Sequence, residues 1–272
     1  MTRSMNDKLV TLAGRLLVTA ILIFVMLPTV VVFISSFSST AVLFFPPKGW
    51  SLRWFERALS YDDFRHGFYS GLIVTAWASS LAVMIGATLA IAIERYSFPC
   101  KQVLEGILLS PLFIPHFTIG LGLLMLVSQL NLGRGYPLVI FCHIVLVLPV
   151  VRRSVHVSLK NLEQRIELAA ASLGASPLLA FRRVTLPLSA PGVISGALFA
   201  FATSFDEVVV TLFLAGPEQA TLPRQMFSGI RENLSPTIAA AATLLIAFSV
   251  VLLLTLEWLR GRSEKLRTQQ PA

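Results

Sequence analysis

Six long apolar segments alternate with short polar ones along the chain, and their spacing predicts membrane-crossing helices. A helix needs about 20 apolar residues to cross a hydrocarbon core of about 30 Å, because each residue rises about 1.5 Å. The stretches free of Asp, Glu, Lys and Arg are Leu16–Pro47, Gly67–Ile93, Gly106–Gly133, Gly135–Val151, Val184–Phe205 and Asn233–Leu256. The first is longer than one crossing, so its helix is expected near Leu16–Phe37. The predicted fold class is an all-α polytopic membrane protein with six transmembrane helices.

The composition supports a membrane location. Of the 272 residues, 55% are hydrophobic and 13% are charged, and the mean hydropathy is +0.77. Soluble domains carry about 25% charged residues, so the composition argues strongly against a water-soluble fold and excludes a disordered chain. The net charge of +8 would suggest nucleic-acid binding in a soluble protein. In a membrane protein it indicates basic cytoplasmic segments, so the expected partner is the lipid bilayer and no nucleic acid.

The basic residues also predict the orientation. An even number of spans places both termini on one side of the membrane. If that side is the cytoplasm, the inner segments hold 15 of the Lys and Arg residues and the outer loops hold 7. This excess predicts cytoplasmic termini. The N-terminal apolar run is interpreted as an uncleaved anchor, because no small-residue cleavage site follows it.

Motifs for chemistry are missing from the sequence. The chain has no Gly-Lys dipeptide, hence no phosphate-binding Gly-x-x-x-x-Gly-Lys loop, and it has no His-Glu-x-x-His or Gly-x-Ser-x-Gly motif. Cys100 and Cys142 form no metal-binding pattern. We therefore expect no catalytic residue, no metal and no cofactor on this chain. His116 and His143 fall within spans, where the simpler interpretation is a helix–helix hydrogen bond.

The largest inner segment, residues 152–187, predicts a two-helix elbow. Leu162–Leu173 is rich in Ala and Leu and should be helical. Gly174 suits a left-handed helix stop, and Ser176-Pro177 has the N-cap and first-turn proline that begin another helix. Phe181 is expected to project from this elbow into a groove of a partner protein, with an amphipathic loop on the bilayer as the alternative.

The elbow resembles the Glu-Ala-Ala loop of binding-protein-dependent ABC importer permeases. The matching residues are Ala169, Ala170, Gly174, Ala175, Phe181, Val184, Leu186 and Pro187. Many members have Glu where this chain has Leu168, and here Glu167 stands one position earlier. The resemblance implies that the elbow contacts a cytoplasmic ATPase. The implied coupling residues are Glu167, Ala169, Ala170, Gly174, Ala175, Phe181 and Arg182.

The resemblance continues over about Phe68–Trp258. Segments such as Ser204–Thr211 and Thr221-Leu222-Pro223 are similar to the second permease subunit of spermidine/putrescine-type importers. That family implies a second homologous permease subunit, a dimer of ABC ATPases, a periplasmic solute-binding protein and the bacterial inner membrane. The expected organisation is an anchor helix and periplasmic loop at 1–67, a transmembrane core at 68–258 and a cytoplasmic tail at 259–272.

Two carboxylates interrupt the fifth span. Charged groups inside a membrane are costly unless they face water, a cation or a partner. On a helix Glu207 shares a face with Thr203, Ser204 and Thr211, while Asp206 lies about 100° away. A solute path lined by Asp206, Glu207, Thr203, Ser204 and Thr211 would attract ammonium groups. The alternative is an ion pair with the partner permease. Of the two acids, Glu207 is expected to matter more because of its hydroxyl-lined face.

The expected function is that of a permease subunit of an ABC importer for a small cationic solute of polyamine type, with ATP hydrolysed by a separate subunit. One alternative is an ABC importer for another small solute, such as an opine or an amino-acid-like compound. Two others come from different classes. A proton-driven carrier would transport alone without ATP, and a membrane scaffold would not need the carboxylates.

Overall fold

The computed structural model describes residues 5–160, 162, 164–232 and 235–268, and these residues form helices without a named strand. Residues 1–4 and 269–272 lie outside the described part, as does Asn233, where the sixth span was expected to begin. The helical content confirms the all-α prediction.

The chain divides into two compact units, Met1–Tyr61 with Ser228–Ala247, and Asp62–Phe227 with Phe248–Ala272. The first unit contains α1 (Met5–Ser35) and α2 (Arg53–Ser60). The loop between them is fixed by the buried Trp54, whose Nε1 donates a hydrogen bond to the Ser38 carbonyl at 2.7 Å. The helices α11 (Leu222–Glu232) and α12 (Pro236–Thr268) contribute residues to both units. The domain boundaries expected from the sequence remain predictions.

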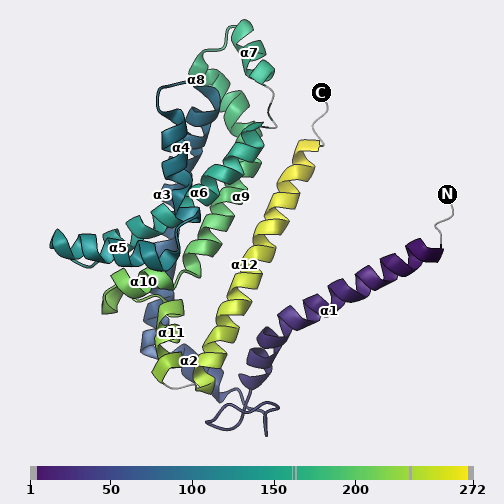
Figure 1. The fold of residues 1–272 in the computed structure, drawn as a ribbon, viewed down its shortest axis with the longest axis vertical. Helices are drawn as coiled ribbons and strands as arrows, with labels where there is room; N and C mark the ends of the chain where they lie inside the picture. The colour runs from purple at the N-terminus through teal and green to yellow at the C-terminus, as the bar shows by residue number, and fades with distance from the viewer. Residues whose placement is uncertain (1–4, 161, 163, 233–234, 269–272) are drawn as a thin grey trace. The chain divides into compact units, whose positions relative to one another are not determined.

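The second unit contains most of the helices. Its elements are α3 (Asp62–Arg95), α4 (Lys101–Leu109), η1 (Ser110–Leu112), α5 (His116–Gln129), α6 (Tyr136–Lys160), α7 (Gln164–Ser172), α8 (Pro177–Ala180), η2 (Phe181–Thr185), α9 (Leu186–Phe205), α10 (Val209–Leu214) and η3 (Pro217–Gln219). The helices α3, α6 and α9 run side by side, and α7 and α8 lie at one end of them (Figure 1). Small residues allow this close packing. Gly86 on α3 and Gly196 on α9 both face Val151 of α6.

Contacts near the helix ends indicate how many times the chain crosses the membrane. Near the starts of α3 and α6, Ser70 and Tyr136 share a hydrogen bond of 2.9 Å, and near their ends Glu94 and His156 lie 2.9 Å apart. The two helices are therefore parallel, so the chain must return between them through α4 and α5. That pair is bent by 106° (Figure 1). With the five long apolar helices, the bent pair makes the six predicted spans.

Candidate functional site

Two spans of the second unit are broken, and the breaks face each other. The first break separates α4 from α5 at Phe113–Pro115, where Pro115 supplies no N–H and disfavours helix at the residue before it. The second separates α9 from α10 at Asp206–Val208. The helices α5 and α10, which follow the two breaks, pack together through Phe117 and Phe213, whose ring centroids lie 5.1 Å apart.

His116 and Glu207 join the two breaks. The imidazole Nδ1 of His116 lies 2.8 Å from Oε2 of Glu207, and Oε1 of Glu207 accepts a hydrogen bond from the Val210 amide at 2.9 Å. The Glu207 side chain is 6% exposed, whereas that of His116 is 43% exposed. Because both carboxylate oxygens have partners, Glu207 serves to cap α10 and to hold it to the start of α5.

A buried polar network surrounds His143 beside this junction. Its Nδ1 lies 2.8 Å from the Ser204 hydroxyl and its Nε2 lies 3.0 Å from the Thr211 hydroxyl. Ser204 also donates to Thr75 of α3 at 3.3 Å. One side chain of α6 therefore connects the end of α9 with α10. The hydrogen bonds of His116 and His143 confirm the helix–helix interpretation made from the sequence.

The five residues predicted to line a solute path fall into two groups. Ser204, Glu207 and Thr211 are buried in the polar contacts described above. Thr203 and Asp206 are exposed. Glu207, the acid expected to matter more, is thus buried and Asp206 is exposed, because the chain turns at Asp206 and the regular helical face ends there.

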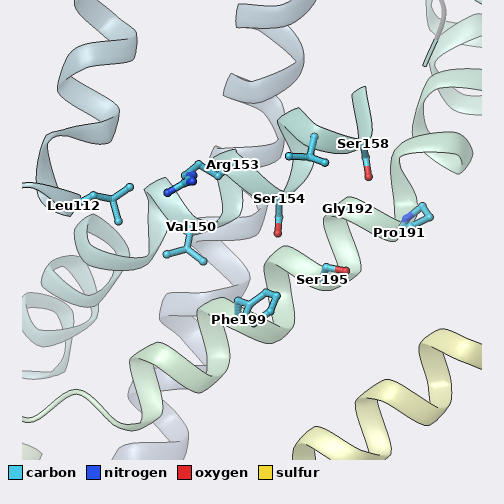
Figure 2. Close-up of a pocket in the computed structure, with 10 residues that line it drawn as sticks. Leu112, Val150, Arg153, Ser154, Ser158, Pro191, Gly192, Ser195 and Phe199 are labelled. Carbon is cyan, nitrogen blue, oxygen red and sulfur yellow. The ribbon is translucent and has the colours of Figure 1, made fainter. Parts of the chain in front are cut away.

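A pocket of about 430 Å³ opens between α6 and α9, toward the other end of α9 (Figure 2). Its lining combines three hydroxyl groups and one arginine with apolar side chains: Leu112, Val150, Arg153, Ser154, Val157, Ser158, Pro191, Gly192, Ser195 and Phe199. Part of its lining is a close contact between the two helices. A Cβ atom placed on Gly192 would lie 2.8 Å from the Ser154 carbonyl oxygen, so only glycine fits there.

The elbow begins as its sequence predicts. Gly174 has φ of 86°, a left-handed conformation that glycine adopts without strain, and it ends α7. Ser176 caps the next helix by accepting a hydrogen bond from the Leu179 amide at 3.3 Å, and Pro177 follows it. The second helix, α8, begins where the sequence predicts, but it does not end before the fifth span. The helical run continues from Pro177 to Phe205 and includes the π-helical turn η2.

Proline explains that wide turn. Pro187 supplies no N–H, and its ring would collide with the carbonyl group four residues earlier in a regular α-helix. The structure relieves this conflict one residue earlier, where the Leu186 amide bonds to the Phe181 carbonyl, five residues back. Such π-turns are frequent at functional sites.

Exposure differs strongly among the predicted coupling residues. Ala169, Gly174 and Arg182 are exposed, while Ala170, Ala175, Phe181 and Glu167 are half-buried. Phe181 therefore does not project as expected. The projecting apolar side chains of the elbow are leucines, with Leu173 89% exposed, Leu178 67% and Leu168 61%. The exposure of Leu173 follows from the helix stop at Gly174, which leaves Leu173 without a following helical turn.

Comparisons with known proteins identify the family. Residues 82–268 match the family described as binding-protein-dependent transport system inner membrane component. The chain belongs to this family. It is an integral inner-membrane transport component, and the permease resemblance inferred from the elbow is confirmed.

Curated relatives match this permease over most of its length. It is 31% identical over 245 residues to a spermidine/putrescine transport system permease protein, PotC, of Escherichia coli (strain K12), covering 89% of this chain and 92% of the relative. It is 32% identical over 251 residues to the putrescine transport system permease protein PotI of the same strain, covering 90% and 89%. It is 30% identical over 254 residues to a putative 2-aminoethylphosphonate transport system permease protein, PhnV, of Salmonella paratyphi A, covering 92% and 94%.

Solved structures share the fold. A chain of a bacterial ABC transporter for the acidic polysaccharide alginate superposes with a TM-score of 0.74 at 14% identity, covering 96% of this permease and 99% of that chain. A chain of the MetNI methionine ABC transporter in an inward-facing conformation gives 0.63 at 16% identity, covering 72% and 94%. At these identities the likeness supports the fold alone.

Proposed function

We propose that this permease is one of two homologous membrane subunits of an ABC importer that carries a small solute with a primary ammonium group, of polyamine type. The chemistry shared by the named solutes of its relatives supports this class. Spermidine, putrescine and 2-aminoethylphosphonate all carry a primary amine, which is protonated at neutral pH. The relatives named for polyamines match the chain over about nine-tenths of its length.

Asp206 is the carboxylate best placed for such an ammonium group. It is exposed, and its carboxylate has no hydrogen bond or ion pair among the described residues. Glu207 is buried and both its oxygens have partners. The exposed hydroxyl of Thr203 lies one helical turn before Asp206, which gives the ammonium a second oxygen. In this proposal Asp206 and Thr203 face the solute, and Glu207, Ser204 and Thr211 hold the surrounding helices.

The proposal also includes the remaining components of an importer. A separate ABC ATPase dimer would hydrolyse ATP and contact the elbow from the cytoplasm, where Leu168, Leu173 and Leu178 offer apolar surface. The periplasmic solute-binding protein would dock at the opposite end of the spans. In this proposal both termini lie in the cytoplasm, and the permease is a transport subunit that binds no nucleotide or cofactor.

The test is uptake of radiolabelled putrescine by proteoliposomes that hold the permease, its partner permease, the ATPases and the loaded binding protein. Uptake should require ATP. A contact between unit charges at about 4 Å contributes about 1 kcal/mol in watery surroundings, or about fivefold in affinity. Asp206→Asn should therefore weaken the apparent affinity for putrescine about fivefold, whereas Asp206→Glu should preserve it.

Glu207→Gln is the matched variant, and it should reduce the amount of stable complex without this change in affinity. Putrescine uptake without ATP, or by the permease alone, would refute the proposed function as an ABC importer subunit. If Asp206→Asn, Asp206→Glu and Glu207→Gln all had the same apparent affinity for putrescine, Asp206 would not contact the solute.

A further inference from the structure

Glu167 of the elbow is turned into its own chain. Its Oε1 accepts a hydrogen bond from the Thr185 hydroxyl at 2.9 Å and lies 3.0 Å from Nη2 of Arg95. The Glu167 side chain is 19% exposed and that of Arg95 is 12% exposed. The adjacent Leu168 is 61% exposed. The carboxylate therefore has its partners inside the permease, while the neighbouring apolar side chain faces outward.

These contacts connect three elements at the base of the elbow. Glu167 belongs to α7, Arg95 is the last residue of α3, and Thr185 ends the π-turn that leads into α9. Thr185 is 4% exposed, so the joint is largely shielded from water. The hydrogen bond from Thr185 to the Glu167 carboxylate, together with the shielded ion pair to Arg95, is therefore stronger than an exposed ion pair, which contributes little.

Two neighbouring ion pairs have a different arrangement. Glu94 pairs with His156, and Glu105 pairs with the buried Arg152, so these contacts join α3 and α4 to α6. Among the ion pairs of the described residues, the Glu167–Arg95 pair is the one that reaches the elbow. Its removal would leave the Arg95 charge largely buried without a carboxylate, which is strongly unfavourable.

We propose that Glu167 is a positioning residue that fixes α7 to α3 and to the π-turn, so that the elbow moves as one body with the transmembrane helices. In this assignment Glu167 does not contact the ATPase, in contrast to the role that the family resemblance implied for it. The movement of the elbow would be driven by the ATPases, and this part of the proposal rests on the proposed function. The joint itself is a property of the permease chain.

Limited proteolysis of the full permease in membranes tests the joint without transport. Chymotrypsin cuts after exposed leucine as well as aromatic residues, and the elbow offers the exposed Leu168, Leu173 and Leu178. Glu167→Gln and Arg95→Gln should each be cut at least about fivefold faster in the elbow, because cleavage follows the population of the opened form. Glu94→Gln, which neutralises the adjacent acid on α3, should be cut at the wild-type rate. The charge swap Glu167→Arg with Arg95→Glu should restore protection to within about twofold.

Coupling is measured in the assembled transporter with the same variants. Glu167→Gln and Arg95→Gln should retain the ATPase on co-purification and continue to hydrolyse ATP, with solute moved per ATP reduced at least about fivefold. Recovery of the solute moved per ATP in the charge-swap variant would support the joint. Unchanged cleavage in Glu167→Gln would overturn it, as would loss of the ATPase in Glu167→Gln but not in Arg95→Gln. If the wild-type complex shows no ATP-driven uptake, the proposed function fails, while the cleavage pattern still decides the role of Glu167.

Discussion

Gly192 offers a test of how closely α9 must approach α6. A Cβ atom at this position would lie 2.7 Å from the Ser158 Cβ and 2.8 Å from the Ser154 carbonyl oxygen. Rotation of a side chain cannot relieve the second clash, because that oxygen belongs to the backbone. Gly192→Ala must therefore shift α9 away from α6 and open the packing around it.

The expected cost follows from two opposing terms. Overpacking in a tight core costs about 1–3 kcal/mol, and replacing glycine by alanine within a helix returns about 1 kcal/mol. The net destabilisation by Gly192→Ala is therefore up to about 2 kcal/mol. At 2–4 °C per kcal/mol for a chain of this size, the apparent Tm should fall by up to about 8 °C.

Thermal unfolding of the detergent-solubilised permease at one fixed scan rate measures this cost. Gly122→Ala on α5 is the matched control, since no atom lies within 4 Å of its Cβ position. Its Tm should stay level or rise. Ser158→Gly in the Gly192→Ala background should recover part of the loss, because the carbonyl clash remains. If Gly192→Ala matched Gly122→Ala in Tm, the close approach of the two helices would be refuted.

Two further predictions concern the elbow. Gly174→Val should insert normally but lower ATP-driven uptake, because a β-branched residue at φ of 86° is strained by about 1–3 kcal/mol; uptake at the wild-type rate would contradict it. Leu173→Ala should weaken co-purification of the ATPase more than Phe181→Ala does, since Leu173 is 89% exposed and Phe181 is half-buried. Equal retention of the ATPase in both variants, compared in one pull-down, would argue against leucine contacts.

Features set by local chemistry were predictable from the sequence. The spans follow from apolar runs that exceed the bilayer thickness, and the elbow stop follows from one glycine. Ser176 and Pro177 start the next helix because their preferences act within a single turn. The continuation of that helix into α9 was not predicted. It depends on a π-turn that accommodates Pro187, and no separate sequence signal distinguishes such a turn from a helix end.

Long-range pairings were beyond sequence reasoning. Residue types indicated that His116 and His143 would bond to other helices, but not to which ones. Glu207 was assigned to a solute path because an ideal helix was extended through the break at Asp206. Once the helix stops there, the two acids separate into one exposed and one buried side chain. The sequence signal that could have predicted this separation is the paired interruption of spans three and five, by Pro115 and by the acids.

The two long-range clusters lie at opposite ends of one helical run. Pro177–Phe205 spans 29 residues, or about 44 Å at 1.5 Å per residue. The base of this run is held by the contact between Thr185 and Glu167, and its far end by the contact between Ser204 and His143. A stiff helix with both ends bonded to neighbouring helices transmits a displacement along its length. Force applied at the elbow would therefore reach the turn that carries Asp206. For this reason, loosening the Glu167 joint is expected to reduce transport without touching the solute.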